Sequence, residues 1–202
     1  MKVFRSATEI GAEFGPSVVA IGNFDGVHAG HRQIMRRVVG LAKTRGYTPA
    51  VLTFDPHPAR VLAPDRAPKL LMTIDQRLRG MEAEGIEAVF LLPFSLDFAK
   101  LTPAEFADAI LAKTLDARIV LVGEDFRFGY KQSGNIDTLR DLGQGLGFVL
   151  EAVAGIARRG EVWAPIGPDG APLIDDATRQ SPSPREGKKF SRALIFSDEQ
   201  GD

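Results

Sequence analysis

Five short apolar runs divide the first three quarters of the chain, and polar residues at helical spacing fill the segments between them. The runs are rich in valine, isoleucine and leucine, and their apolar positions are continuous rather than alternating. Continuous runs of this length are typical of strands in a sheet that is covered on both faces. The pattern predicts strands at residues 17–21, 49–54, 88–92, 118–122 and 148–153.

Helical patterns lie between the predicted strands. Residues 30–45 place Ile34, Val38 and Leu41 on one stripe, and Gly46 follows as a stop signal. Three further segments begin beside a residue that can cap a helix, at residues 75–84, 102–113 and 135–142. Strands that alternate with helices of this size predict an α/β fold with a parallel five-stranded sheet and right-handed crossovers.

The most informative motif lies between the first strand and the first helix. Residues 21–31 read Ile-Gly-Asn-Phe-Asp-Gly-Val-His-Ala-Gly-His, which places His28 and His31 beside a helix N-terminus. Backbone N–H groups and the helix dipole favour an anion such as phosphate there. Two alternatives are a glycine-rich turn with surface histidines and a zinc site that uses all three histidines of the chain. The zinc site is the weaker alternative, because no H-E-x-x-H motif or matching carboxylate spacing is present.

A second motif, Phe54-Asp55-Pro56-His57-Pro58, ends the second strand and holds the third histidine. Its prolines restrict the backbone, so that Asp55 and His57 are held rigidly at the edge of the sheet. The same residues are also compatible with a stiff turn that has no further role. Ligands of parallel α/β sheets bind beyond the carboxyl ends of the strands. Both histidine motifs fall at that edge.

A third motif follows the fourth strand, where residues 122–129 read Val-Gly-Glu-Asp-Phe-Arg-Phe-Gly. Gly123 allows a ligand to approach the backbone closely. Asp125 can accept hydrogen bonds from a base or a ribose, and Arg127 can face a phosphate or simply be solvated. The phenylalanines here, and those in residues 93–101, can stack on a planar ring, although core packing is the commoner role of such residues.

Composition narrows the function classes. The chain has 202 residues, a net charge of −1 and no cysteine, which excludes disulfides, thiol catalysis and cysteine-ligated metals. Its balanced charge gives no support to nucleic acid as a main partner. No signal peptide or membrane-spanning run is evident in the sequence. We therefore expect a soluble, cytoplasmic protein, and the sequence leaves its oligomeric state open.

Together, residues 22–31, 53–58, 98–106 and 122–129 occur in the order and spacing of one family. The chain resembles the N-terminal adenylyltransferase module of the prokaryotic bifunctional riboflavin kinase/FAD synthetases over roughly residues 10–162. That family has a Rossmann-like fold of the H-x-G-H nucleotidylyltransferase type. The resemblance implies transfer of AMP from ATP to FMN, which gives FAD and pyrophosphate and requires magnesium.

The resemblance also implies a role for each motif. His28 and His31 would be catalytic, because they would contact the ATP phosphates and stabilise charge on the α-phosphoryl group during transfer. Asp55 would be a magnesium ligand. The implied ATP-binding residues are Gly22, Phe24, Gly30, Gly123, Asp125 and Arg127. The implied FMN-binding residues are Asn23, Asp25, Phe54, His57 and Phe128.

The last quarter of the chain departs from the family. A serine–serine–threonine–x–isoleucine–arginine signature is expected after the fifth strand, but residues 160–168 read Gly-Glu-Val-Trp-Ala-Pro-Ile-Gly-Pro. We predict a nucleotidylyltransferase domain at residues 1–154 and a loosely ordered tail at residues 155–202. We expect no riboflavin kinase activity, since only about 40 residues follow the predicted sheet.

Three hypotheses for the function follow. The first is an FMN adenylyltransferase, whose activity the missing signature would reduce or abolish. The second is a nucleotide- or flavin-binding relative without turnover, and the third is an H-x-G-H nucleotidylyltransferase with another acceptor. The Asp-Phe-Arg-Phe-Gly and Pro-His-Pro motifs favour the flavin branch over the third hypothesis.

Overall fold

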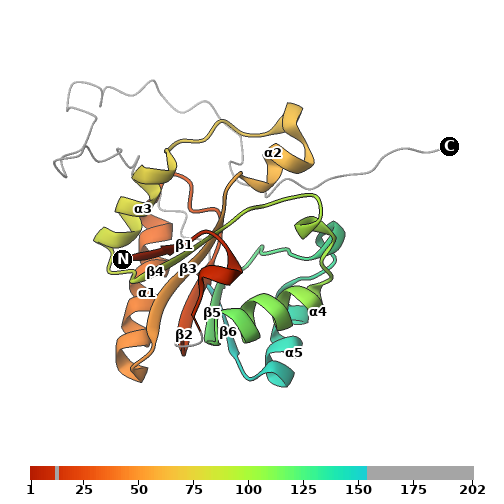
Figure 1. The fold of residues 1–202 in the computed structure, drawn as a ribbon. Coiled ribbons are helices and arrows are strands. Elements are labelled where there is room, and N and C mark those ends of the chain that lie inside the picture. Colours follow the sequence, from red (N-terminus) through yellow and green to blue (C-terminus); the bar gives the residue numbers. More distant parts are fainter. Residues whose placement is uncertain (12–13, 154–202) are drawn as a thin grey trace, which may run out of the picture. The chain divides into compact units, whose positions relative to one another are not determined.

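A parallel sheet of six strands forms the centre of the structure. The computed structural model describes residues 1–11 and 14–153. The strands stand in the order β1-β4-β3-β2-β5-β6, and every neighbouring pair is parallel (Figure 1). Their bounds are Lys2–Phe4 for β1, Ser17–Ile21 for β2, Thr48–Phe54 for β3, Ala88–Leu92 for β4, Ala117–Gly123 for β5 and Val149–Val153 for β6.

The parallel, Rossmann-like α/β fold predicted from the sequence is confirmed, but the count of five strands is wrong. The additional strand is β1, which pairs with β4 at the edge of the sheet through Lys2 and Ala88, Val3 and Val89, and Phe4 and Phe90. A run of three residues is too short to show a periodicity of its own. Its pairing is therefore visible only in the folded chain.

In the described residues, five α-helices and five 3₁₀- or π-helical segments connect the strands. Helix α1 ends where predicted, since Gly46 takes a left-handed conformation at its C-terminus. Thr73 and Thr102 form capping boxes with Gln76 and Glu105. The α-helices are Ala29–Arg45 (α1), Pro58–Leu62 (α2), Ile74–Ala83 (α3), Pro103–Glu105 (α4) and Ile136–Leu146 (α5). The 3₁₀-helical segments are Ala7–Glu9, Pro64–Arg66, Phe98–Lys100 and Tyr130–Gln132, and the π-helical segment η4 (Phe106–Thr114) continues α4.

Helices cover both faces of the sheet. Helices α1 and α3 lie on one face, and α4, η4 and α5 lie on the other (Figure 1). Strand β2 is buried throughout, with Val18 and Ala20 in the core beneath α1, and Val19 and Ile21 in the core beneath η4. This two-sided burial explains why the strand shows a continuous apolar run.

The order of the strands creates a switch point between β2 and β5. From β2 the chain proceeds outward through β3 and β4, and it then crosses to the other side of β2 to form β5 and β6. The loops that follow β2 and β5 therefore run to opposite faces, and ligands of open α/β sheets bind beyond the carboxyl ends of the strands at such a switch point. The predicted boundary at residue 154 and the predicted tail lie outside the described residues.

Candidate active site

The two histidines of the first motif are stacked at the start of α1. His28 is the N-terminal cap of this helix, and its Nδ1 accepts a long hydrogen bond of 3.4 Å from the backbone N–H of His31. The two rings lie 3.7 Å apart between centroids, with 19° between their planes. Because Nδ1 of neutral His28 accepts, its proton is on Nε2. The exposed His28 therefore has an N–H that can donate to a phosphate oxygen.

His31 lies deeper in the molecule. The edge of its ring meets the buried Phe24, with 5.1 Å between the centroids. Within the described part of the chain, its Nδ1 is buried and has no hydrogen-bond partner. Burial, and to a lesser extent the neighbouring His28, lowers the pKa of His31 to about 3. His31 is therefore neutral near pH 7 and can supply a directed N–H donor without carrying a charge.

The low pKa of His31 predicts acid sensitivity. In the unfolded chain this imidazole has its ordinary pKa of about 6.5. Between pH 6.5 and about pH 3, the unfolded chain binds a proton at this imidazole and the folded chain does not. The free energy of unfolding is therefore unaffected by His31 above pH 6.5 and decreases as the pH falls below it. We expect His31→Gln to give a flatter plot of melting temperature against pH. His28→Gln is a companion variant that should flatten the plot less, because burial, the larger cause of the His31 shift, remains. Parallel curves for His31→Gln and wild type would contradict the assignment.

Two predicted ATP-binding glycines lie against the rings of this motif. A Cβ at Gly30 would lie 3.2 Å from Cε1 of His28, and a Cβ at Gly22 would lie 3.2 Å from the ring of Phe24. Phe24 itself is buried at φ 49°, so its ring supports His31 from the core. These three positions therefore shape the histidine motif, and their contact with ATP stays a prediction.

Asp25, predicted to bind FMN, has its carboxylate engaged elsewhere. The two oxygens accept from the backbone N–H of Leu71, at 3.0 and 2.9 Å, and one oxygen also accepts from that of Met72, at 3.1 Å. Asp25 thus holds the segment before α3 against the histidine motif. The side chain of Leu71 remains 74% exposed at this place.

We expect Asp25→Ala to loosen this segment. Charge-assisted hydrogen bonds to backbone N–H groups are the stronger kind, and their loss should raise hydrogen exchange of the Leu71 and Met72 amides by at least about tenfold. Exchange resolved at single amides measures this change. Asp75→Ala, at an exposed position on α3, is the control and should leave both amides unchanged. Unchanged exchange in Asp25→Ala would show that other contacts hold the segment.

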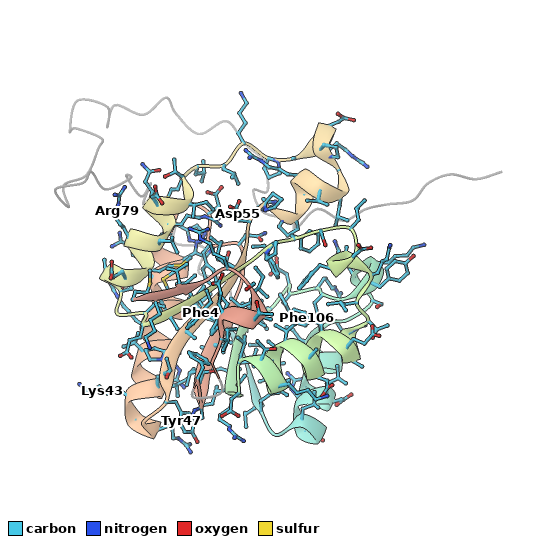
Figure 2. All side chains as sticks on the ribbon, viewed as in Figure 1. Phe4, Lys43, Tyr47, Asp55, Arg79 and Phe106 are labelled. Carbon is cyan, nitrogen blue, oxygen red and sulfur yellow. The ribbon has the colours of Figure 1, made fainter. Side chains whose placement is uncertain are left out.

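The second motif forms the turn from β3 into α2. His57 caps α2, and its Nδ1 accepts from the backbone N–H of Ala59 at 3.1 Å, so this histidine also carries its proton on Nε2. Burial lowers the pKa of His57, with Asp25 acting in the opposite direction. Asp55 is exposed at the end of β3 that lies opposite Tyr47 (Figure 2). Both side chains thus lie at the predicted edge of the sheet.

A row of phenylalanines continues from this turn. The ring of Phe54 meets those of Phe94 and Phe98 edge-on, with 5.5 Å between centroids in each pair. Phe98 in turn contacts Phe106 at 6.2 Å. Phe54, Phe94 and Phe98 are each partly exposed, whereas Phe106 is buried. The row therefore offers aromatic surface to a planar ligand at the carboxyl end of β3.

The third motif divides into exposed and buried residues. Gly123 ends β5, and Asp125 and Arg127 are exposed beyond it. Phe128, predicted to bind FMN, is only 7% exposed and packs on Phe106 and Phe126. It supports the aromatic row from the core, and its contact with FMN stays a prediction.

Arg77 is a residue of this site that the sequence reasoning missed. It lies on α3, is 3% exposed, and donates from Nη1 to the backbone oxygen of Asn23 at 2.7 Å. Asn23 itself is exposed beside the histidine motif. The sequence did contain a signal for Arg77, because it falls on the same helical stripe as Ile74, Leu78 and Met81, which face the core. A charged residue at a core position is unusual unless it has partners.

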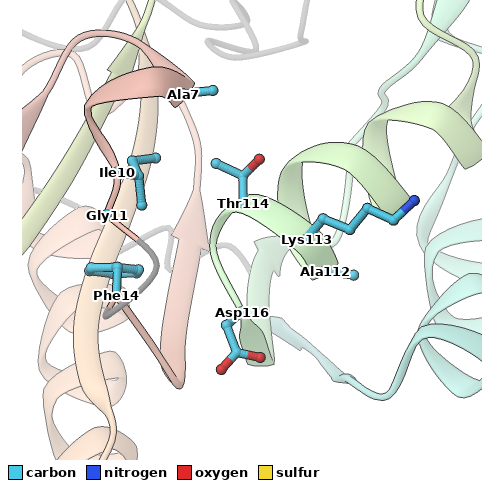
Figure 3. Close-up of a pocket in the computed structure, with 8 residues that line it drawn as sticks. All are labelled: Ala7, Ile10, Gly11, Phe14, Ala112, Lys113, Thr114 and Asp116. Carbon is cyan, nitrogen blue, oxygen red and sulfur yellow. The ribbon is translucent and has the colours of Figure 1, made fainter.

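Two cavities lie at opposite edges of the sheet. One, of about 400 Å³, is lined by residues that precede β2 and β5, at the opposite ends of those strands (Figure 3). Its charged groups Lys113 and Asp116 are already paired, with Asp108 and Arg118 respectively. The other, of about 490 Å³, lies between α1 and the end of β6, where Arg37 pairs with Glu151. Neither includes a predicted site residue.

Comparison with known proteins identifies the family. The FAD synthetase family matches residues 11–163. The bifunctional riboflavin kinase/FMN adenylyltransferase of Pseudomonas fluorescens is 36% identical over 152 residues, which is 75% of this chain and 49% of that protein. The protein of that name from Escherichia coli K12 is 36% identical over 131 residues, which is 65% of this chain and 42% of its own length. The chain spans about half the length of these curated relatives.

A solved structure shows the same fold. A protein from Streptococcus pneumoniae that is described as a macrolide-efflux protein gives a TM-score of 0.66 at 28% identity. The match covers 78% of this chain and 50% of that one. Among the residues that the structure describes, no helix is long and apolar enough to cross a membrane. On the match of residues 11–163, which is most of its length, the chain belongs to the FAD synthetase family.

Proposed function

We propose that this chain transfers the AMP group of ATP to FMN, with FAD and pyrophosphate as the products. The observation that carries the proposal is the stacked pair of His28 and His31 at the N-terminus of α1, next to the switch point between β2 and β5. Backbone N–H groups, the helix dipole and imidazole donors there all favour phosphate. Membership of the FAD synthetase family supports the same reaction.

The reaction needs positioning and electrostatic stabilisation more than a protein nucleophile. A phosphate oxygen of FMN attacks the α-phosphorus of ATP, and the bond from that phosphorus to the bridging oxygen of pyrophosphate breaks. Pyrophosphate leaves with the electron pair. His28 and the neutral His31 donate hydrogen bonds to phosphate oxygens as charge develops on them.

The remaining motifs give each substrate a place. The partly exposed Phe54, Phe94 and Phe98 would stack on the flavin ring. Asn23 and the Nε2 proton of His57 lie at the same edge and would contact FMN. On the other side of β2, Gly123 and the exposed Asp125 and Arg127 of the third motif would hold ATP.

Magnesium belongs to this proposal as a companion of the ATP phosphates. The described residues contain no group of three or more histidine, cysteine or acidic side chains that could hold a metal by themselves. The exposed carboxylate of Asp55 fits the usual magnesium site, in which one or two carboxylates and substrate phosphates share the ion. When bound, the ion would neutralise phosphate charge. A cytoplasmic location, where ATP and magnesium are present, completes the proposal.

Chromatography of FAD after incubation with ATP, magnesium and FMN tests this function. We expect FAD formation that depends on all three additions and is absent from heat-denatured protein. Parallel reactions replace FMN with other phosphorylated acceptors. An adenylylated product from another acceptor, without FAD, would favour a different nucleotidylyltransferase. FMN binding without any product would indicate a binding relative that lacks turnover.

A further inference from the structure

Arg77 joins the ends of the two strands that carry the histidine motifs. Its Nη1 donates to the backbone oxygen of Asn23, two residues after the end of β2, at 2.7 Å. Its Nη2 makes a longer contact of 3.5 Å with the backbone oxygen of Phe54, the last residue of β3. Thr53 adds a hydrogen bond from its hydroxyl to the oxygen of Asn23 at 3.3 Å. One guanidinium thus ties the phosphate-facing motif to the turn that holds Asp55 and His57.

The helix that carries Arg77 also supports the histidine motif sterically. Gly80 is one turn further along α3, and a Cβ there would lie 3.2 Å from both methyl groups of Val27. Val27 is fully buried with φ 38°, directly before His28. A residue with a side chain at position 80 would therefore press on the loop that sets the position of His28. Helix α3 therefore packs against residues 23–27 at two positions, Arg77 and Gly80.

The charge of Arg77 is buried close to two carboxylates at the edge of the site. Asp25 and Asp55 both favour the charged guanidinium, although burial is the larger influence and lowers the pKa of Arg77. Two unbalanced carboxylates would repel polyanionic substrates such as ATP and FMN from the site. A fixed positive charge behind them offsets that repulsion without occupying the substrate's place.

We propose that Arg77 is a positioning residue for adenylyl transfer, a role that rests on the proposed function. Through the backbone oxygens of Asn23 and Phe54 it fixes the spacing between the phosphate-facing histidines and the flavin-facing turn. Its charge balances Asp25 and Asp55 beside the anionic substrates. Small displacements of groups that align two substrates can reduce the rate about a hundredfold, so the effect should be large although Arg77 itself need not touch substrate.

Two variants separate the charge from the bridge. Arg77→Gln removes the charge and keeps one amide donor, whereas Arg77→Lys keeps the charge and loses the two-armed contact. Arg79→Gln, on the same helix at an exposed position labelled in Figure 2, removes the same charge without the contacts and is the matched control. Each variant of the 202-residue chain is assayed for kcat, KM and FMN affinity, at a temperature well below its own melting temperature.

We expect Arg77→Gln to lower kcat by about 10- to 100-fold and to weaken FMN binding by about tenfold. Arg77→Lys should recover FMN binding while kcat stays reduced, and Arg79→Gln should stay within about twofold of wild type. If Arg77 is merely structural, its substitution lowers the melting temperature but leaves kcat and KM unchanged, and Arg77→Lys then has the same kcat and KM as Arg77→Gln. That result would overturn the proposal.

Failure of the proposed function gives a different result. Wild-type chain that forms no FAD contradicts adenylyl transfer, and Arg77 is then judged by FMN affinity, read from the quenching of flavin fluorescence. In that case, an Arg77→Gln affinity within about twofold of wild type overturns the positioning role. Wild-type chain that neither forms FAD nor binds FMN overturns both. If Arg77→Gln does not fold, Arg77→Lys decides between the positioning role and a merely structural role. A reduced kcat with normal FMN affinity supports the positioning role, and an unchanged kcat overturns it.

Discussion

His31→Ala is expected to lower the kcat of FAD formation by about 10²- to 10³-fold without unfolding the chain. A preorganised donor that meets developing charge typically accounts for a loss of this size. His31 supplies such a donor at the first turn of α1, stacked on His28 at 3.7 Å and supported by the edge of Phe24. Its buried Nδ1 has no partner in the described structure, so its removal breaks no hydrogen bond of that atom.

The measurement is kcat at saturating ATP and FMN, together with the melting temperature, at pH 8 where every histidine is neutral. His28→Ala is the informative companion, because His28 also caps α1 and its loss should lower the melting temperature slightly. If the two histidines act as a unit, the double variant should be little worse than either single one. Unchanged turnover of His31→Ala in an active parent would remove its catalytic role. A large loss of melting temperature would show that its main role is in the core.

The edge of the sheet that carries the site could be predicted from the sequence. Strand β2 is buried on both faces, so its apolar run is continuous, and the glycine-rich segment after it can only be a turn into α1. The caps Thr73 and Asn135 act locally, through hydrogen bonds to residues three positions away. Apolar runs and helix caps depend only on residues that are close together in the sequence, so a single sequence shows them directly.

The contacts that shape the site could not be predicted in the same way. Asp25 binds the backbone of Leu71, 46 residues away, and Arg77 binds that of Asn23, 54 residues away. Backbone partners leave no mark in the sequence, because every residue offers the same N–H and C=O groups. The aromatic residues show the same limit. Phe54 is partly exposed and Phe128 is buried, although Phe54 ends β3 and Phe128 lies in the motif that follows β5.

The missing serine–serine–threonine–x–isoleucine–arginine signature leads to the second large effect. In the family that this chain resembles, the hydroxyls and the arginine of that signature hold phosphates, whereas residues 160–168 here contain none of those residue types. Loss of two or three charge-assisted contacts, at about 1.5–3 kcal/mol each, lowers affinity or rate by several orders of magnitude. We expect kcat/KM for ATP to be about 10²- to 10⁴-fold below that of a relative with the signature, assayed side by side.

Deletion of the residues after Val162 shows whether another part of the chain replaces the signature. The cationic candidates in the deleted segment include Arg185, Lys188 and Lys189. Each is surrounded by proline, glycine and polar residues, a composition that favours solvated charges over a packed lid. We therefore expect the truncated and full chains to agree within about threefold in ATP affinity and FAD formation. A truncated chain with clearly weaker ATP affinity would contradict this expectation and support a substitute for the signature within the deleted segment, since deletion leaves His28, His31 and Arg77 in place.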